Sequence, residues 1–346
     1  MVYSTNTKGR EVIEYFSFLR VFACVGILFL HSFSTSFSMH KDTLNLSQRF
    51  ISQVGSLSFM WAVPIFVMVS GALLLNPEKD ISTGDIVFKY IKRMLIALIV
   101  FGILFQIYDA IFDKEPFAWA IIAEGLKNIV QGTSWSHLWY IYLLIGLYCT
   151  LPLFRAFTKT ATNQEIKFLL GILFLFLSVL PLLELANITV GFYIHFSTIY
   201  PFYFLVGYAL HNRIISINKT ASIGMVVLGI MGIVLSVYGS VYGQLENMNV
   251  LWNYPSISVV LSSMGLFSIF SQIKKRNKFV SLLDGISFGI YLIHMVFIHC
   301  LLEQGIIKPY QGNLIVNVCL VVLVSFILSG CTSYLLKKIP FLCNIL

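Results

Sequence analysis

The chain has 346 residues, of which 58% are hydrophobic and 11% are charged, and its net charge is +8. Soluble domains carry about 25% charged residues, and a soluble globule could not cover this much apolar surface. The composition therefore excludes an ordinary soluble enzyme, a secreted disulfide scaffold and a disordered chain. The apolar stretches are continuous and do not alternate with polar residues, so they exclude a transmembrane barrel and predict helices.

About ten segments are long and apolar enough to be predicted as membrane-spanning helices. They lie near 16–36, 57–76, 93–112, 138–156, 168–186, 193–211, 220–242, 253–272, 285–304 and 313–336. The segment 115–132 is only partly apolar, so we expect an interfacial or re-entrant helix there, and we expect the longest loops around 37–56 and 113–137. These segments predict an all-α, polytopic membrane protein in which residues 1–346 form a single domain.

The distribution of positive charge predicts the topology. With both termini in the cytoplasm, most lysines and arginines lie in cytoplasmic segments, as the positive-inside rule requires. The outer segments carry only Lys41, Arg49, Lys114, Lys127 and Lys308. The basic net charge is explained in this way, and we expect no nucleic-acid partner. The six cysteines lack the spacing of metal ligands, so we expect no metal.

The first predicted helix carries two ionisable residues, Arg20 and His31. They are eleven positions apart, which is close to three helical turns, so their side chains share one helix face about 16 Å apart along the axis. Ionisable groups inside a membrane are costly and usually functional. A snorkelling anchor for Arg20 and an interhelical hydrogen bond for His31 stay open as structural alternatives.

Polar groups also mark the second and third predicted spans. Ser70 and Gly71 form a small, polar spot that suits either close helix packing or a functional site. Lys89, Lys92 and Arg93 lie on adjacent turns at the start of the third span. Such a cluster indicates the cytoplasmic side, and it also suits a phosphate group.

Histidines accompany aromatic residues in two further spans. His137 and Trp139 open the fourth span at its predicted outer end. An aromatic belt explains Trp139 but not His137, and the same groups suit a sugar. Tyr291 and His294 are three positions apart in the ninth span, so they lie on nearly the same helix face.

Together these segments resemble the acyltransferase-3 family of integral membrane acyltransferases. The resemblance rests on Arg20-x10-His31 and, in the same order as in the family, on VPIFVMVSG, HLWYIYLLIGLY, FYFLVGYAL and ISFGIYLIH. It covers nearly the whole chain, and among standalone members it is nearest to the type that O-acetylates enterobacterial common antigen. The family's Arg-x-x-Arg is replaced here by Lys89-x-x-Lys92, followed by Arg93, which keeps the charge without the two-pronged geometry of arginine.

The resemblance implies an O-acyltransferase of the inner (plasma) membrane. It would move an acetyl group from cytoplasmic acetyl-CoA to a hydroxyl of a cell-surface or lipid-linked glycan, with His31 as general base. The expected catalytic residues are His31 and Arg20, the donor-binding residues are Lys89, Lys92, Arg93 and Ser70, and the acceptor-binding residues are His137, Trp139, Tyr291 and His294.

Other functions stay open at this point. A transporter or flippase for a lipid-linked glycan would also need about ten spans and aromatic outer ends, but it gives no reason for the alignment of Arg20 with His31. A non-catalytic membrane scaffold would tolerate the loss of His31. Succinyl transfer would change only the acyl group. No sequence feature indicates an oligomeric state.

Overall fold

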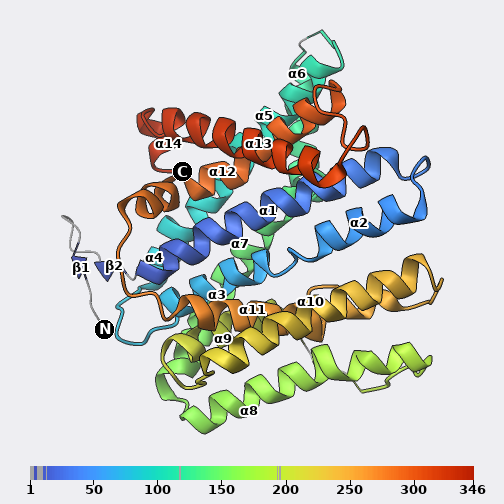
Figure 1. Ribbon diagram of the computed structural model, residues 1–346. Helices are drawn as coiled ribbons and strands as arrows, with labels where there is room; N and C mark the ends of the chain where they lie inside the picture. The colour runs from blue at the N-terminus through green and yellow to red at the C-terminus, as the bar shows by residue number, and fades with distance from the viewer. Residues whose placement is uncertain (1–3, 6–10, 13, 117, 193, 195) are drawn as a thin grey trace. The chain divides into compact units, whose positions relative to one another are not determined.

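The computed structural model describes residues 4–5, 11–12, 14–116, 118–192, 194 and 196–346 (Figure 1). Nearly all of its elements are helical, and the strands β1 (Ser4–Thr5) and β2 (Glu11–Val12) form one short antiparallel pair. The predicted all-α, polytopic class is confirmed. Contacts divide the chain into two compact units. Unit 1 comprises Met1–Asn76 and Thr160–Gly330, and unit 2 comprises Pro77–Lys159 and Cys331–Leu346.

Unit 1 contains most of the helices. Besides β1 and β2 it holds α1 (Glu14–His40), α2 (Leu46–Leu57), α3 (Ala62–Leu74), α8 (Asn163–Phe174), η3 (Leu175–Val179), η4 (Leu180–Ala186), α9 (Tyr200–His211), α10 (Lys219–Val241), η5 (Met248–Leu251), α11 (Ile257–Phe270), α12 (Lys278–Glu303) and most of α13 (Leu314–Leu336). Unit 2 holds α4 (Thr83–Asp85), η1 (Ile86–Ile91), α5 (Lys92–Phe112), α6 (Trp119–Gln131), η2 (Ser136–Leu138), α7 (Trp139–Thr160, up to its last residue), the end of α13 and α14 (Pro340–Cys343).

Eight helical segments of the described chain are long and apolar enough to cross a membrane. They are Glu14–His40, Leu46–Leu74, Thr83–Phe112, Ser136–Thr160, Asn163–Ala186, Lys219–Val241, Lys278–Glu303 and Leu314–Leu336. The predicted spans 193–211 and 253–272 contain the shorter helices α9, with 12 residues, and α11, with 14 residues. Helices of these lengths extend about 18–21 Å, against a hydrocarbon core of about 30 Å. The count of ten spans and the side of the termini stay predictions.

The segments predicted as the two longest loops are partly helical. Residues 46–57 form α2, because Asn45 caps its first turn: the Asn45 side chain accepts from the Gln48 backbone N–H at 2.9 Å, and the Gln48 side chain accepts from the Asn45 backbone N–H at 3.1 Å. The loop prediction for 37–56 is therefore wrong over α2. Residues 119–131 form α6, so a helix in the predicted segment 115–132 is confirmed.

A shared apolar core joins α1, α12 and α13 in unit 1. Most of its buried members recur every four residues, which places them on one face of each helix. They include Cys24 and Leu28 on α1, Ile286 and Ile290 on α12, and Leu314, Val318 and Val322 on α13. This core fixes α12 against α1, and the polar groups described below lie on these two helices.

Helices α3 and α9 approach each other closely in the same unit (Figure 1). A Cβ atom added at Gly71 would lie 1.8 Å from the carbonyl oxygen of Phe204, and one added at Gly207 would lie 2.0 Å from the carbonyl oxygen of Met68. Only glycine allows this backbone contact, as at small-residue interfaces of membrane helices. The close-packing interpretation of the Ser70–Gly71 spot is confirmed.

We expect Gly71→Ala to destabilise the protein by about 1–3 kcal/mol, because the new methyl group meets backbone atoms that cannot rotate away. The thermal unfolding midpoint of the purified protein in detergent measures this change. Gly171→Ala in α8 is the matched control, since nothing lies within 4 Å of its added Cβ and alanine favours a helix over glycine. Equal midpoints for Gly71→Ala and the control would contradict the close packing.

Candidate active site

Arg20 on α1 forms a two-pronged ion pair with Asp284 on α12. The Arg20 Nε donates to Asp284 Oδ1 at 2.6 Å, and Nη2 donates to Oδ2 at 2.6 Å. The Ser17 hydroxyl, one turn earlier on α1, donates to Asp284 Oδ2 at 2.7 Å. The Arg20 and Asp284 side chains are only 28% and 15% exposed. The geometry is the parallel fork that makes arginine–carboxylate pairs strong.

His31 lies further along α1 and contacts His294 on α12. The two imidazole rings are 5.3 Å apart between centroids and are tilted by 45°. His31 is partly buried, and His294 is fully buried. The His294 Nδ1 lies 2.6 Å from the carbonyl oxygen of Tyr291, which can only accept, so Nδ1 carries the proton. In the neutral ring, Nε2 is then the nitrogen with the lone pair, and it can accept a proton or a hydrogen bond.

These contacts show that α1 and α12 run parallel in nearly constant register. Arg20 meets Asp284, the thiol of Cys24 lies 3.7 Å from the carbonyl oxygen of Ser287, and His31 meets His294. Each partner on α12 lies 263 or 264 positions after its counterpart on α1. The prediction that Arg20 and His31 share one helix face is confirmed, because both side chains contact α12.

The arrangement therefore combines a histidine pair with a partly buried, two-pronged ion pair on two parallel helices. The sequence model of an acyltransferase domain matches residues 13–334. The chain belongs to the acyltransferase-3 family. No curated protein and no solved structure matches it.

The basic residues expected at the donor site of this acyltransferase lie in unit 2. Lys89 is on η1, and Lys92 and Arg93 begin α5. The guanidinium of Arg93 donates to the backbone carbonyls of Ile345 and Leu346 at 2.8 and 2.9 Å. Lys89 and Lys92 have exposed side chains. Arg93 thus already stabilises the packing of its own unit, whereas the two lysines remain open to a ligand.

His137 and Trp139, expected at the acceptor site, also lie in unit 2. His137 is only 1% exposed, and its ring packs 5.3 Å from the Phe105 ring. The neighbouring Trp135 indole donates to Asp109 Oδ2 at 2.8 Å. His137 therefore belongs to a buried aromatic cluster, whereas Trp139 is partly buried at the start of α7.

Ser70 lies in unit 1 on α3. Its hydroxyl donates to the Phe66 carbonyl of the same helix at 2.9 Å, as serines within membrane helices commonly do. In the part of the chain that the structure describes, no three His, Cys, Asp or Glu side chains come close enough to hold a metal ion. Of the expected site residues, unit 1 brings His31 next to His294, whose ring lies 6.0 Å from the Tyr291 ring, and Arg20 lies on the same α1 face as His31.

Asp284 and Ser17 are the site residues that sequence reasoning missed. Asp284 directly precedes the predicted span 285–304, so the prediction places it in the polar segment before the helix. The structure extends α12 back to Lys278, which places Asp284 six residues inside the helix. The available signal was an acidic residue near a membrane span that contains no other acidic residue before Glu303.

Proposed function

We propose that this membrane acyltransferase is an inner-membrane enzyme that transfers an acetyl group from cytoplasmic acetyl-CoA to a hydroxyl of a cell-surface or lipid-linked glycan. The donor's phosphates would meet basic side chains on the cytoplasmic side, with Lys89 and Lys92 as candidates. The acceptor would come from the other side of the membrane, and Trp139 is a candidate to stack on it. The enterobacterial-common-antigen type remains our candidate for the acceptor class.

The histidine pair is the observation that carries this proposal. An acyl transfer to a hydroxyl needs a group that removes the hydroxyl proton, and a neutral imidazole is the usual choice. His31 is such a group on a membrane helix, and His294 beside it has Nε2 as its lone-pair nitrogen. His294 therefore suits accepting a hydrogen bond from the sugar hydroxyl or from the His31 ring. In this tautomer it does not suit donating to a developing oxyanion.

The proposed reaction is a direct transfer from the thioester to the sugar hydroxyl. His31 takes the proton from the sugar hydroxyl while the hydroxyl oxygen bonds to the thioester carbonyl carbon. The carbon–sulfur bond then breaks, and the leaving thiolate takes the proton from His31. The products are the acetyl ester and free CoA, and His31 returns to its neutral form. Tyr291 is our candidate for the donor that stabilises the oxyanion.

Arg20 and Asp284 act as positioning residues in this proposal. Their two-pronged pair holds α12 in one register on α1, and the same register places His294 beside His31. Because the Arg20 guanidinium is already engaged by a carboxylate, we assign the donor phosphates to other cations.

The test is transfer of label from [acetyl-14C]acetyl-CoA by the purified protein in nanodiscs, with lipid-linked glycan extract as acceptor. We expect alkali-labile label in the glycan fraction. Free CoA should be measured by chromatography, because the exposed Cys149, Cys319, Cys331 and Cys343 would react with thiol reagents.

Two other outcomes would overturn parts of the proposal. If label from succinyl-CoA appears faster than label from acetyl-CoA, the transferred group is succinyl and the acetyl assignment is wrong. If neither donor gives label and the protein moves the lipid-linked glycan across a liposome membrane, the function is that of a flippase and the proposed transfer reaction is wrong. Boiled protein and extract without protein serve as controls.

A further inference from the structure

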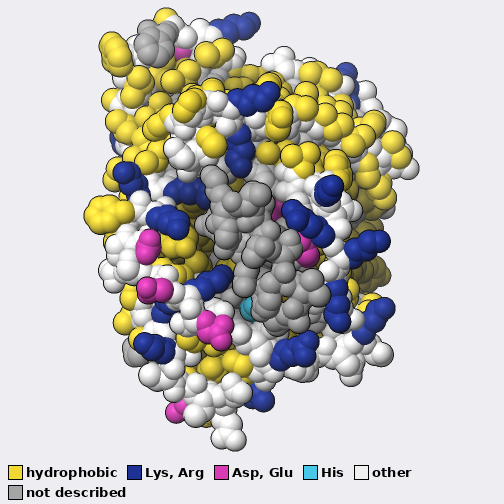
Figure 2. All heavy atoms as spheres, turned by 90° about the vertical axis from the view of Figure 1, so that its left-hand side faces the viewer, with side chains coloured by type: hydrophobic (Ala, Val, Ile, Leu, Met, Phe, Trp, Pro, Cys, Tyr) yellow, Lys and Arg dark blue, Asp and Glu magenta, His cyan; other side chains and the backbone are white. Residues whose placement is uncertain are grey.

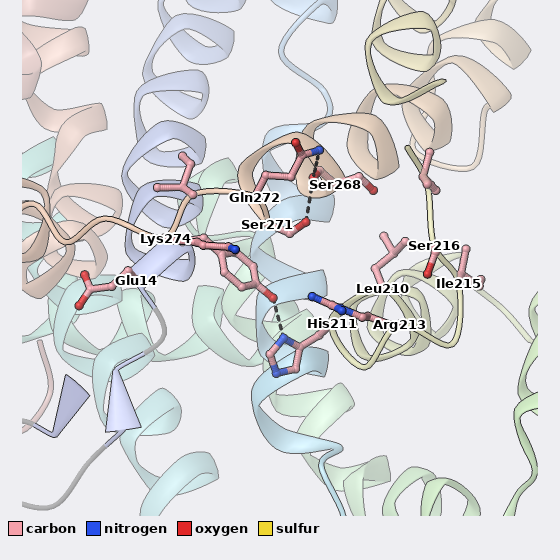
Figure 3. Close-up of a pocket in the computed structure, with 13 residues that line it drawn as sticks. Glu14, Leu210, His211, Arg213, Ile215, Ser216, Ser268, Ser271, Gln272 and Lys274 are labelled. Atoms are coloured by element: carbon pink, nitrogen blue, oxygen red, sulfur yellow. Dashed lines mark hydrogen bonds between the residues drawn. The ribbon is translucent and has the colours of Figure 1, made fainter. Parts of the chain in front are cut away.

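Unit 1 contains a cavity of about 700 Å³ where α1 begins and where α9 and α11 end (Figure 3). This volume lies within the range of about 300–1,000 Å³ typical of small-molecule sites. The cavity walls include Tyr15 on α1, His211 and Arg213 at the end of α9, and Ser268 and Lys274 at and after the end of α11. None of these residues belongs to the histidine pair or to the Arg20–Asp284 pair.

The cavity is lined by groups that bind phosphate. Figure 3 shows the charged ends of Arg213 and Lys274 directed toward each other from opposite sides of the cavity. Arginine and lysine are the side chains that recognise phosphate oxygens most strongly. Glu14 also lines the cavity, but the Arg276 guanidinium lies 3.7 Å from its carboxylate and offsets its charge.

The chain turns sharply after α9, and Arg213 lies at this turn, in the wall of the cavity. Arg213 has φ of +59° and ends the helix in a left-handed cap, in which the Ile214 N–H donates to the Ala209 carbonyl at 2.9 Å. A separate feature indicates that the cavity suits a polar ligand. The Ser268 hydroxyl, 5% exposed as a residue, has no hydrogen-bond partner among the described residues. A buried hydroxyl of this kind costs free energy unless something binds it.

The distance between the cavity and His31 limits which ligands could reach both. Tyr15, at the cavity, and His31, at the proposed chemistry, are sixteen residues apart on α1, which is about 24 Å along the axis. A ligand anchored in the cavity needs a long, thin arm to present a reactive group to His31. A nucleotide that carries an acyl thioester on an extended arm has this shape.

We propose that this cavity, which we call the Arg213 pocket, binds the phosphorylated nucleotide end of the acyl donor through Arg213 and Lys274. The inference rests on the proposed function, and it assigns the donor's phosphates to Arg213 and Lys274 in place of the candidates Lys89 and Lys92. Figure 2 shows the side of the molecule on which α1 begins, and this side carries many Lys and Arg side chains and fewer Asp and Glu. Such a face attracts anionic ligands.

Binding of adenosine 3′,5′-bisphosphate to the purified protein in zwitterionic nanodiscs tests the proposal by calorimetry. We expect Arg213→Gly and Lys274→Ala to weaken binding at least about tenfold. Glycine adopts the left-handed conformation of Arg213 readily, so Arg213→Gly should fold as wild type does, and a loss of binding would report the loss of the side chain. Lys275→Ala is the matched control, since Lys275 is exposed and does not line the pocket. We expect its binding to stay within twofold of wild type.

The outcomes separate the pocket from the chemistry. Wild-type-like affinity of Arg213→Gly and Lys274→Ala, or no binding by wild type, would overturn the pocket, even if the protein transfers acetyl groups. Inorganic phosphate alone binding as tightly as the nucleotide would overturn the nucleotide assignment, as would displacement of the nucleotide by anionic lipid in the nanodisc. Nucleotide binding that depends on Arg213, in a protein without transfer activity, would support the pocket and overturn the proposed function.

Discussion

Replacing His31 with alanine is expected to lower the rate of acetyl transfer by about 10²–10⁴-fold, which is the usual contribution of a positioned general base. The His31 ring lies beside His294, so its loss removes the group that takes the hydroxyl proton. The measurement is label transfer under saturating donor and acceptor. The affinity for adenosine 3′,5′-bisphosphate should not change, because His31 is about 24 Å along α1 from the Arg213 pocket.

His40→Ala is the matched control for this prediction. His40 ends the same helix, and its ring bonds to the Ser36 carbonyl at 3.0 Å, away from the histidine pair. Its transfer rate should stay close to that of wild type. A His31→Ala protein that elutes and melts like wild type, yet transfers label within twofold of the wild-type rate, would remove His31 from the chemistry.

Asp284→Ala should lower the free energy of unfolding by about 2–3 kcal/mol, because it leaves the Arg20 charge in a largely buried place without its partner. The ion pair is two-pronged and is supported by Ser17, so three hydrogen bonds are lost together. The unfolding midpoint in detergent measures the effect. We also expect transfer activity to fall, because α12 loses the contact that sets its register.

A double variant and a surface pair provide the controls. Arg20→Met with Asp284→Leu should recover much of the stability, since no uncompensated charge remains. Lys127→Ala breaks the Glu124–Lys127 pair, whose side chains are 49% and 57% exposed, and should cost less than about 0.5 kcal/mol. If Asp284→Ala melts no earlier than Lys127→Ala, the ion pair contributes nothing to stability.

Helical periodicity alone predicts the half of the site that lies on α1. Arg20 and His31 are on one face because their spacing is close to three turns, and the structure bears this out through their contacts with α12. Their partners could not be predicted in the same way. Asp284 and His294 lie more than 260 positions away, and which helix packs against α1 depends on tertiary packing.

The differences between the predicted and the observed helix bounds have physical causes. The segment around 37–56 is predicted as a loop, but the reciprocal Asn45–Gln48 cap starts a helix there at Leu46. Helices α9 and α11 are shorter than the apolar stretches that contain them, because bends at 197–199 and bends and turns at 253–256 take up part of each stretch. Apolar composition sets the amount of buried chain, whereas caps and turns decide where each helix begins.

Because the offset between α1 and α12 is nearly constant, one ion pair sets the register of both helices along their shared length. A shift of α12 by one residue would move it about 1.5 Å and turn it by 100°, so Asp284 would leave the guanidinium of Arg20 and His294 would turn away from His31. The salt bridge therefore sets the register of the histidine pair from eleven residues away on α1 and ten residues away on α12. A change in the length of either helix between these two contacts can be accommodated only by an equal change in the other.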